Sequence, residues 1–144
     1  MKRAGLLVLL LGFCVSPVLA EEAGMCVDSV PHLIRVPLVR QGTDHTCGVA
    51  ALMSLFAYYG IEYREDQLTA KLHAEDYASA DEIVSVARAE GFKVRARRNM
   101  TLVDLRRYID RGIPVLVCLQ AWSDTPVVYR TGWEDGHWVV VNGY

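Results

Sequence analysis

The sequence lacks a large charge of either sign, and it lacks the motifs that usually announce a metal or a nucleotide. Its 15 Lys and Arg nearly balance 17 Asp and Glu, and the formal net charge is −2. A nucleic-acid partner is therefore not expected, because such proteins carry a basic excess. Neither CxxC nor HxxxH spacing occurs, which argues against a metal site, and no cofactor is expected.

One apolar run, at the start of the chain, does not match the pattern of a helix or strand in a globular domain. Residues 1–20 carry a basic pair at positions 2 and 3, an apolar run over positions 6–15, and small residues before Glu21. This order is typical of a secretory signal peptide, and the run is too short to span a bilayer. We expect removal of residues 1–20, a periplasmic or secreted protein, and no stable membrane span afterwards. A lipoprotein signal around Cys14 is disfavoured by the bulky Phe13 before it.

Removal of residues 1–20 leaves 124 residues and, with Lys2 and Arg3 gone, a net charge of about −4. This length suits one domain with a real core, and the sequence contains no internal repeat. Residues 21–34 show no periodicity and are expected to be an irregular segment ahead of the domain, which spans residues 35–144. Oligomeric state is left open by the sequence.

A single cysteine stands where a polar turn becomes a long apolar helix. Residues 48–59 are almost all apolar and are followed by Gly60, so they predict a buried helix with Cys47 in its first turn. Free N–H groups and the helix dipole favour a thiolate there. Gly48 would let a substrate backbone approach the sulfur, and the Gln41 amide could donate to an oxyanion.

The competing interpretation is that Cys47 is one more small apolar core residue, which is the commoner role of an isolated cysteine. A catalytic thiol also needs a base. His137 begins the last apolar segment after a Gly, so it could face a cleft, with Val139 and Val141 on the same face of a strand. A lone His is more often structural, and His45 is too close to Cys47 along the chain to pair productively.

The chain without residues 1–20 keeps three cysteines, Cys26, Cys47 and Cys118. In an oxidising compartment an odd number leaves at least one thiol unpaired within the chain. A Cys26–Cys118 disulfide with Cys47 free is one possibility. The simpler one is that Cys118, inside an apolar run, is a buried core residue.

The remaining elements follow in order along the chain. Residues 36–39 predict an edge strand or extended lead-in. Helices are expected over residues 63–72, after a capping box that starts at Ser79, and after Thr101, where Leu102, Leu105 and Ile109 should face inward. Strands are expected over residues 92–98, over 115–119 with both faces covered, and over 137–144. Arginines at 95, 97, 98, 106, 107 and 111 are expected on solvated faces.

Several blocks in this order resemble the bacteriocin-processing, double-glycine-leader peptidases, family thirty-nine of the cysteine peptidases. The blocks are Gln41-x5-Cys47-Gly48-x-Ala50, Tyr58-Tyr59-Gly60, Gly112-Ile-Pro114-Val and His137-x-Val-Val-Val-x-Gly-Tyr. The resemblance covers nearly all of residues 35–144. It implies an α+β papain-like fold, helical in its first half with an antiparallel sheet in its second half, and incomplete if further strands follow Tyr144.

The resemblance also implies roles for three residues. Cys47 would be the nucleophile, His137 the general base and acid, and Gln41 an oxyanion donor, with a peptide or protein as substrate. An Asp or Asn one strand beyond the His orients its ring in the family, a position past Tyr144 here. Asp124 and Asp135 are candidates by folding back, whereas Asn142 would point to the opposite strand face.

Two departures keep other functions open. Family members fused to export transporters work on the cytoplasmic side, while this chain begins with a predicted signal peptide and has no nucleotide-binding motif. Its substrate therefore need not carry a Gly-Gly leader. The alternatives are an acyltransferase that uses the same Cys and His, and an inactive peptide-binding relative. A metal site built on His45 and Cys47 lacks any supporting motif.

Overall fold

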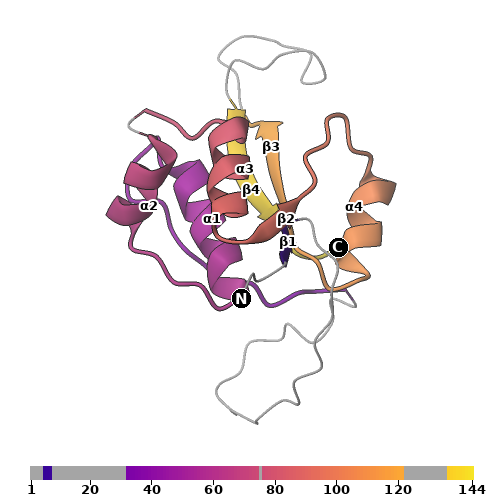
Figure 1. The fold of residues 1–144 in the computed structure, drawn as a ribbon. Helices are drawn as coiled ribbons and strands as arrows, with labels where there is room; N and C mark the ends of the chain where they lie inside the picture. Colours follow the sequence, from indigo (N-terminus) through magenta and orange to yellow (C-terminus); the bar gives the residue numbers. More distant parts are fainter. Residues whose placement is uncertain (1–4, 8–31, 75, 122–135) are drawn as a thin grey trace, which may run out of the picture.

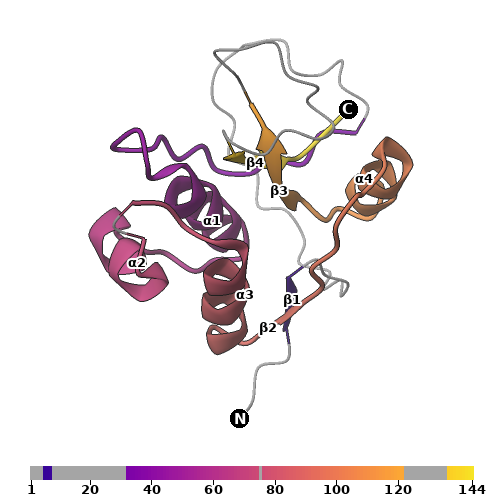
Figure 2. The same cartoon turned by 90° about the horizontal axis from the view of Figure 1, so that it is seen from above.

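A computed structural model describes residues 5–7, 32–74, 76–121 and 136–144 (Figure 1). Helices dominate the first half and a small antiparallel sheet the second, so the expected α+β order is confirmed. Seen from above, α2 and α3 lie beside α1 on one side, and β3 and α4 lie on the other (Figure 2). In chain order the elements are β1 (Gly5–Leu7), α1 (Cys47–Tyr58), α2 (Glu65–Leu72), α3 (Ala80–Ala89), β2 (Phe92–Val94), α4 (Leu102–Ile109), β3 (Val115–Gln120) and β4 (Gly136–Val141).

Helix α1 forms the centre of the core because apolar side chains cover nearly all of its surface. Val49, Leu52 and Phe56 are completely buried, and Leu68 and Leu72 of α2 are buried against the same cluster. Burial of each such side chain contributes roughly 1.5–3 kcal/mol. This cluster fixes α1, and with it the place of the cysteine at its first position.

The ends of the helices follow the local sequence closely. In α3 the Ser79 hydroxyl accepts a hydrogen bond from the Glu82 N–H at 3.3 Å, and the Glu82 carboxylate accepts one from the Ser79 N–H at 2.9 Å. Thr101 and Asp104 form the same box on α4. Gly60 and Gly112, just after α1 and α4, have φ of 78° and 73°, the left-handed conformation that glycine adopts without strain. The predicted capping residues and helix ends are confirmed.

Strands β3 and β4 pair in an antiparallel ladder that sets Cys118 opposite Trp138 and Leu119 opposite His137. The edge strand or lead-in predicted over residues 36–39 is not a regular strand, and neither are residues 32–36, which we call the lead-in. Leu33 bridges Gly143, and the Ile34 N–H donates to the Asn142 carbonyl at 2.7 Å. The lead-in therefore contacts the residues that directly follow β4, although the two segments are far apart in the sequence.

The predicted strand over residues 92–98 is too long. Only Phe92–Val94 is a strand, paired in parallel with Gly5–Leu7 of β1. In the described part of the chain no partner continues this ladder past Val94, and the backbone turns at Asn99, whose φ is 55°. Alternating residues alone do not make a strand, because the ladder needs a second backbone to bond to.

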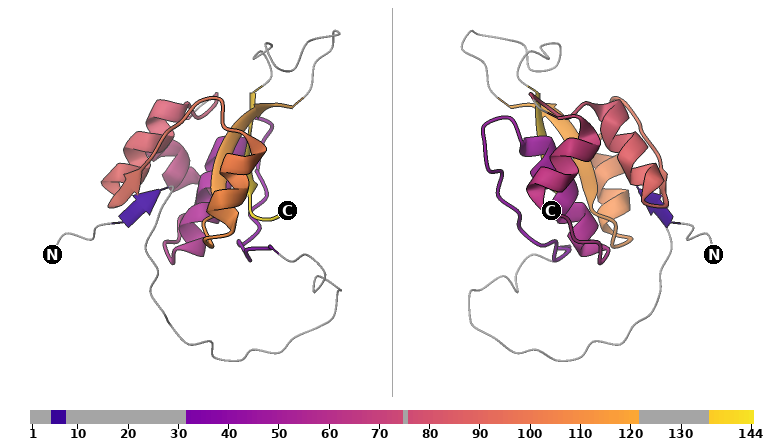
Figure 3. Two further views of the ribbon diagram at one scale, coloured as in Figure 1. Left: turned by 90° about the vertical axis from the view of Figure 1, so that its right-hand side faces the viewer. Right: turned by 60° about the vertical axis from the view of Figure 1, so that its left-hand side comes forward.

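Two burial predictions are also wrong. Leu102 was expected to face inward, but it is 74 % exposed at the start of α4, while Ile109 at the other end is buried. Strand β3 was expected to be covered on both faces, yet burial falls along it from Val115 to Leu119. Helix α4 lies on the other side of β3 from α2 and α3 (Figure 2), and in the left view of Figure 3 it lies in front of the sheet.

Candidate active site

Cys47 is the first residue of α1 and is half-buried. The preceding Thr46 occupies the capping position, but its hydroxyl does not cap the helix. Instead Thr46 Oγ1 accepts from the Thr43 N–H at 3.1 Å and donates to the Thr43 carbonyl at 3.3 Å. The first-turn N–H groups of α1 are thus left without a side-chain cap, unlike those of α3 and α4.

The charges in the first turn of α1 also differ from those in α3 and α4. The first turn of α1 contains no acidic residue, whereas α3 has two and α4 has one. Acidic residues in a first turn would offset the positive end of the helix dipole. The dipole and the uncapped N–H groups of α1 can therefore interact with a negative group at Cys47, either a thiolate or an oxyanion.

Gln41 lies in the exposed turn before α1. Its Nε2 donates to the Thr43 carbonyl at 2.9 Å, and the Gly42 N–H donates to Glu65 Oε1 of α2 at 3.0 Å. These two bonds hold the turn in place. An amide NH2 carries two hydrogens, so the Gln41 side chain keeps one donor beyond the bond to Thr43.

Gly48 has a different role from the predicted one. It is buried, and a Cβ at this position would lie 2.8 Å from Ala78 Cβ and 2.9 Å from Trp138 Cδ1. The space that a side chain would occupy is taken by these two residues, so Gly48 allows α1 to approach β4 and the segment before α3. The expectation that Gly48 leaves room for a substrate backbone was wrong.

His137 is half-buried near the start of β4. Its neighbour Trp138 touches Gly48, which is the neighbour of Cys47. Helix α1 and strand β4 both begin at the upper end of the view in Figure 1. Cys47 and His137 therefore lie at the same end of α1 and β4, but the strand face that contacts Gly48 is the one that carries Trp138. Strand alternation sends His137 to the face shared with Val139 and Val141, as expected, and Trp138 to the other face.

Cys118 is a second thiol near this end of the sheet. It is exposed and free, so it is not the buried core residue that its apolar run indicated; Cys26, the partner in the other prediction, lies outside the described residues. A Cβ on Gly136 would lie 3.4 Å from its Sγ. Although the residue is exposed, partial burial of its thiol raises the pKa of Cys118, and the nearby Cys47 raises it further.

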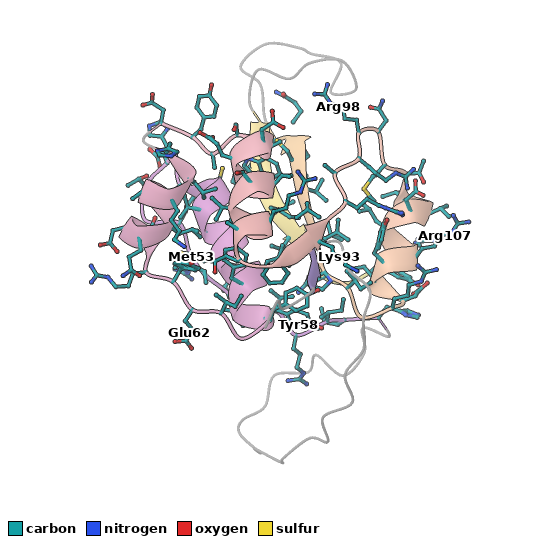
Figure 4. The ribbon with its side chains drawn as sticks, viewed as in Figure 1. Met53, Tyr58, Glu62, Lys93, Arg98 and Arg107 are labelled. Atoms are coloured by element: carbon teal, nitrogen blue, oxygen red, sulfur yellow. The ribbon has the colours of Figure 1, made fainter. Side chains whose placement is uncertain are left out.

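A cavity of about 800 Å³ lies beside Trp138 and Cys118, and its lining does not include Gln41, Cys47 or His137. It lies between α3, the segment after β2, and β3, and Trp138 forms part of its wall. Its lining is mainly apolar, with Arg95, Arg97 and Arg98 contributed by the segment after β2. Figure 4 shows Arg98 on this segment and Arg107 pointing outward from α4. Arg97 Nη1 lies 3.5 Å from Asp104 Oδ1, a partly exposed pair.

Asn142 does not take the role of the residue that orients the His137 ring. Its Nδ2 donates to the Ile34 carbonyl at 3.1 Å, so this amide ties the lead-in to the end of the sheet. The other two candidates, Asp124 and Asp135, lie outside the described residues.

The described residues contain no group of three or more His, Cys, Asp or Glu side chains that could hold a metal ion. Among these same residues no helix has the length and apolar character needed to cross a membrane.

An apolar helix that begins with a cysteine, followed by a small antiparallel sheet that begins with a histidine, defines an α+β papain-like fold. Residues 35–144 match the Peptidase C39 family, the bacteriocin-processing double-glycine-leader peptidases, and the chain belongs to this family. No curated protein matches the chain, nor does any solved structure.

Proposed function

We propose that this C39 domain is an active cysteine peptidase with Cys47 as nucleophile, His137 as general base and acid, and Gln41 as oxyanion donor. One observation carries the proposal: Cys47 lies at an uncapped helix N-terminus that is packed against the strand bearing His137. A papain-like thiol site needs this pairing of helix start and strand start.

The first half of the reaction forms an acyl-enzyme. His137 takes the proton of the Cys47 thiol, and the thiolate attacks the carbonyl carbon of a peptide bond. The developing oxyanion accepts hydrogen bonds from the Cys47 N–H and from the Gln41 amide, whose second hydrogen is not used by Thr43. The protonated His137 then gives its proton to the leaving amine.

The second half restores the enzyme. His137 removes a proton from water, the hydroxide attacks the thioester carbonyl, and the acid product leaves as the Cys47 sulfur is released. An extended peptide is the substrate class that fits this chemistry, and the apolar cavity beside Trp138 offers space for apolar side chains.

Cleavage of a peptide library, read by mass spectrometry, tests the proposal. We expect Cys47→Ala to reduce cleavage to background, His137→Ala to reduce it severely, and Gln41→Ala to lower kcat by about 10²–10³-fold. Cys118→Ala is the matched control, because it removes a neighbouring thiol and should leave cleavage intact. Full activity of Cys47→Ala would refute the assignment.

The same products separate the alternatives. Newly joined amides in place of hydrolysed fragments would identify an acyltransferase. Binding of extended peptides without any product would identify an inactive relative. Labelling of Cys47 by iodoacetamide at pH 6 adds a second readout, because a thiolate paired with imidazolium reacts at this pH and His137→Ala should slow it.

We also propose that the protein acts outside the cytoplasm, on the strength of the signal-peptide pattern in residues 1–20. Fractionation of expressing cells with mass determination of the product tests this. An exported form that begins at Glu21 is expected; a cytoplasmic form that retains Met1 would contradict it.

A further inference from the structure

The Trp138 side chain lies where three elements meet. It extends from β4, its ring is in contact distance of Gly48 at the start of α1, and its Nε1–H donates to the Ala78 carbonyl at 2.9 Å. Ala78, 3 % exposed, belongs to the segment that leads into α3. One indole ring therefore joins the strand, the helix and this segment.

The fit around the ring is close and directional. A buried indole N–H needs an acceptor, and its single donor here is used by Ala78, which fixes the plane of the ring. Gly48 has no side chain, so the ring can lie directly against the helix backbone, and even a methyl group would approach it to 2.9 Å. A shift of α1 along β4 must disturb the contact with Gly48, and a shift of the segment before α3 must break the hydrogen bond to Ala78.

The neighbours of this contact are the proposed reacting residues. Cys47 precedes Gly48, and His137 precedes Trp138. Each proposed reacting residue is therefore bonded directly to a residue of the Gly48–Trp138 contact. Little chain lies between them to absorb a movement. A misplacement of ~1 Å in such a site costs on the order of 10²-fold in rate.

We propose that Trp138 is a positioning residue: its indole holds the N-terminus of α1 against β4 and so sets Cys47 relative to His137. The inference rests on the proposed function, since it assigns a role within that site. Trp138 takes no proton and forms no bond to substrate in this role. It fixes the geometry in which His137 acts on Cys47.

Trp138→Phe tests the role, because it keeps an aromatic ring and removes the donor to Ala78. Tyr58→Phe is the matched control. Tyr58 also lies on α1, at the opposite end from Cys47 (Figure 4), and its hydroxyl donates to the Gly112 carbonyl at 3.0 Å. Each variant loses one side-chain bond to a distant backbone carbonyl, so a loss of general stability should affect both alike.

Two quantities are measured on variants shown to be folded by circular dichroism. The first is kcat and KM for a cleaved peptide. The second is the rate of iodoacetamide labelling of Cys47 at pH 6, with and without His137→Ala. For Trp138→Phe we expect kcat to fall on the order of tenfold with KM little changed, and the His137 dependence of labelling to shrink. Tyr58→Phe should change neither.

A second variant changes the α1 side of the same contact. Gly48→Ala places a methyl group against the ring and against Ala78, and it should reproduce the fall in kcat and in His137-dependent labelling. Ala78→Gly in the same chain should restore part of the loss, because it removes one of the two crowding atoms. A rate for Trp138→Phe equal to wild type in both assays would overturn the proposal, as would equal losses in Tyr58→Phe.

Failure of the proposed function gives a different pattern. If His137→Ala leaves Cys47 labelling and cleavage unchanged in the wild-type background, the Cys47–His137 assignment fails whatever Trp138 does. If His137→Ala has its expected effect and Trp138→Phe has none, only the positioning role is refuted.

Discussion

Cys47 and Cys118 are two thiols of the same domain in different surroundings. Cys47 is half-buried at a helix N-terminus, where dipole and N–H groups favour negative charge. Cys118 lies on strand β3, opposite Trp138, and is not part of a helix end. Their reactivity should differ accordingly, although both are single cysteines in apolar stretches of sequence.

Selective alkylation should show this difference. Burial and the nearby Cys47 raise the pKa of Cys118, so at pH 7 a smaller part of it is thiolate than in a free cysteine, and it should label more slowly than Cys47. Cys47→Ser removes the like charge, lowers the pKa of Cys118 and should speed its labelling. Rates are measured by iodoacetamide with mass spectrometry of the peptides.

Unfolded protein is the control for this comparison, because in urea the two thiols should label at similar rates. Faster labelling of Cys118 than of Cys47 in the folded protein, or no response of Cys118 to Cys47→Ser, would contradict the arrangement described.

At the scale of elements, α2 and α3 are joined by a small polar network. Lys71 Nζ of α2 donates to Glu90 Oε1 at 2.7 Å and to the Tyr63 hydroxyl at 2.6 Å, and the Tyr63 hydroxyl also donates to Glu90. The Lys71 and Tyr63 donors lower the pKa of Glu90, and Glu90 and Tyr63 raise the pKa of Lys71. The network therefore stabilises the packed helices when both groups are charged.

The sign of the pH dependence follows from these shifts. The Glu90 contribution is present above its unfolded pKa of about 4.3 and is lost as the pH falls through the lower folded value. The Lys71 contribution is present below its unfolded pKa of about 10.4 and is lost at higher pH, above the raised folded value. The network should act between roughly pH 4 and pH 10.

Glu90→Gln should lower the free energy of unfolding by about 1 kcal/mol at pH 7, a value reduced by the partial exposure of the pair. The difference from wild type should shrink as the pH falls below the unfolded pKa of about 4.3, and it should vanish once Glu90 is protonated in both states. Urea unfolding at several pH values measures both. Asp66→Asn, which breaks the exposed pair with Arg64, is the control and should change stability by less.

At the scale of the whole molecule, the lead-in and the last residues hold each other and α4. Leu33 bridges Gly143, the His32 ring stacks on Tyr144 at 4.6 Å, and the Tyr144 hydroxyl donates to Asp110 at 2.7 Å. Asp110 follows α4 directly. Residues more than 100 positions apart in the chain thus form one edge of the domain.

Gly143→Ala should loosen this edge. A Cβ there would lie 2.9 Å from the His32 carbonyl oxygen and 3.2 Å from Leu33 Cα, which are backbone atoms with little freedom to move. We expect a loss of about 1–3 kcal/mol in the free energy of unfolding and faster hydrogen exchange at the Ile34 N–H. Urea unfolding and exchange by NMR measure these.

Gly136→Ala, at the start of β4, is the matched control, because among the described residues its Cβ would meet only Cys118 Sγ at 3.4 Å. It should cost less than Gly143→Ala. Equal stability of the two variants would show that the lead-in contributes little to the fold.

Much of the local structure follows from neighbouring residues. The buried helix α1, the capping boxes at Ser79 and Thr101 and the left-handed Gly60 and Gly112 were all predicted, because each depends on atoms within a few residues. The order of the motifs also predicted the family and the α+β fold, both confirmed. The roles of Cys47, His137 and Gln41 remain predictions from the same motifs.

What the sequence by itself determined is therefore local: which segments form helices, where they end, and that a thiol stands at a helix start. Only the tertiary structure decided that Gly48 receives Trp138, that Cys118 is exposed beside the site, and that the strand at Phe92–Val94 stops early. The reason is physical. Side-chain periodicity gives the face on which a residue lies, but contacts such as that of Gly48 with Trp138, 90 residues along the chain, depend on how separate elements dock.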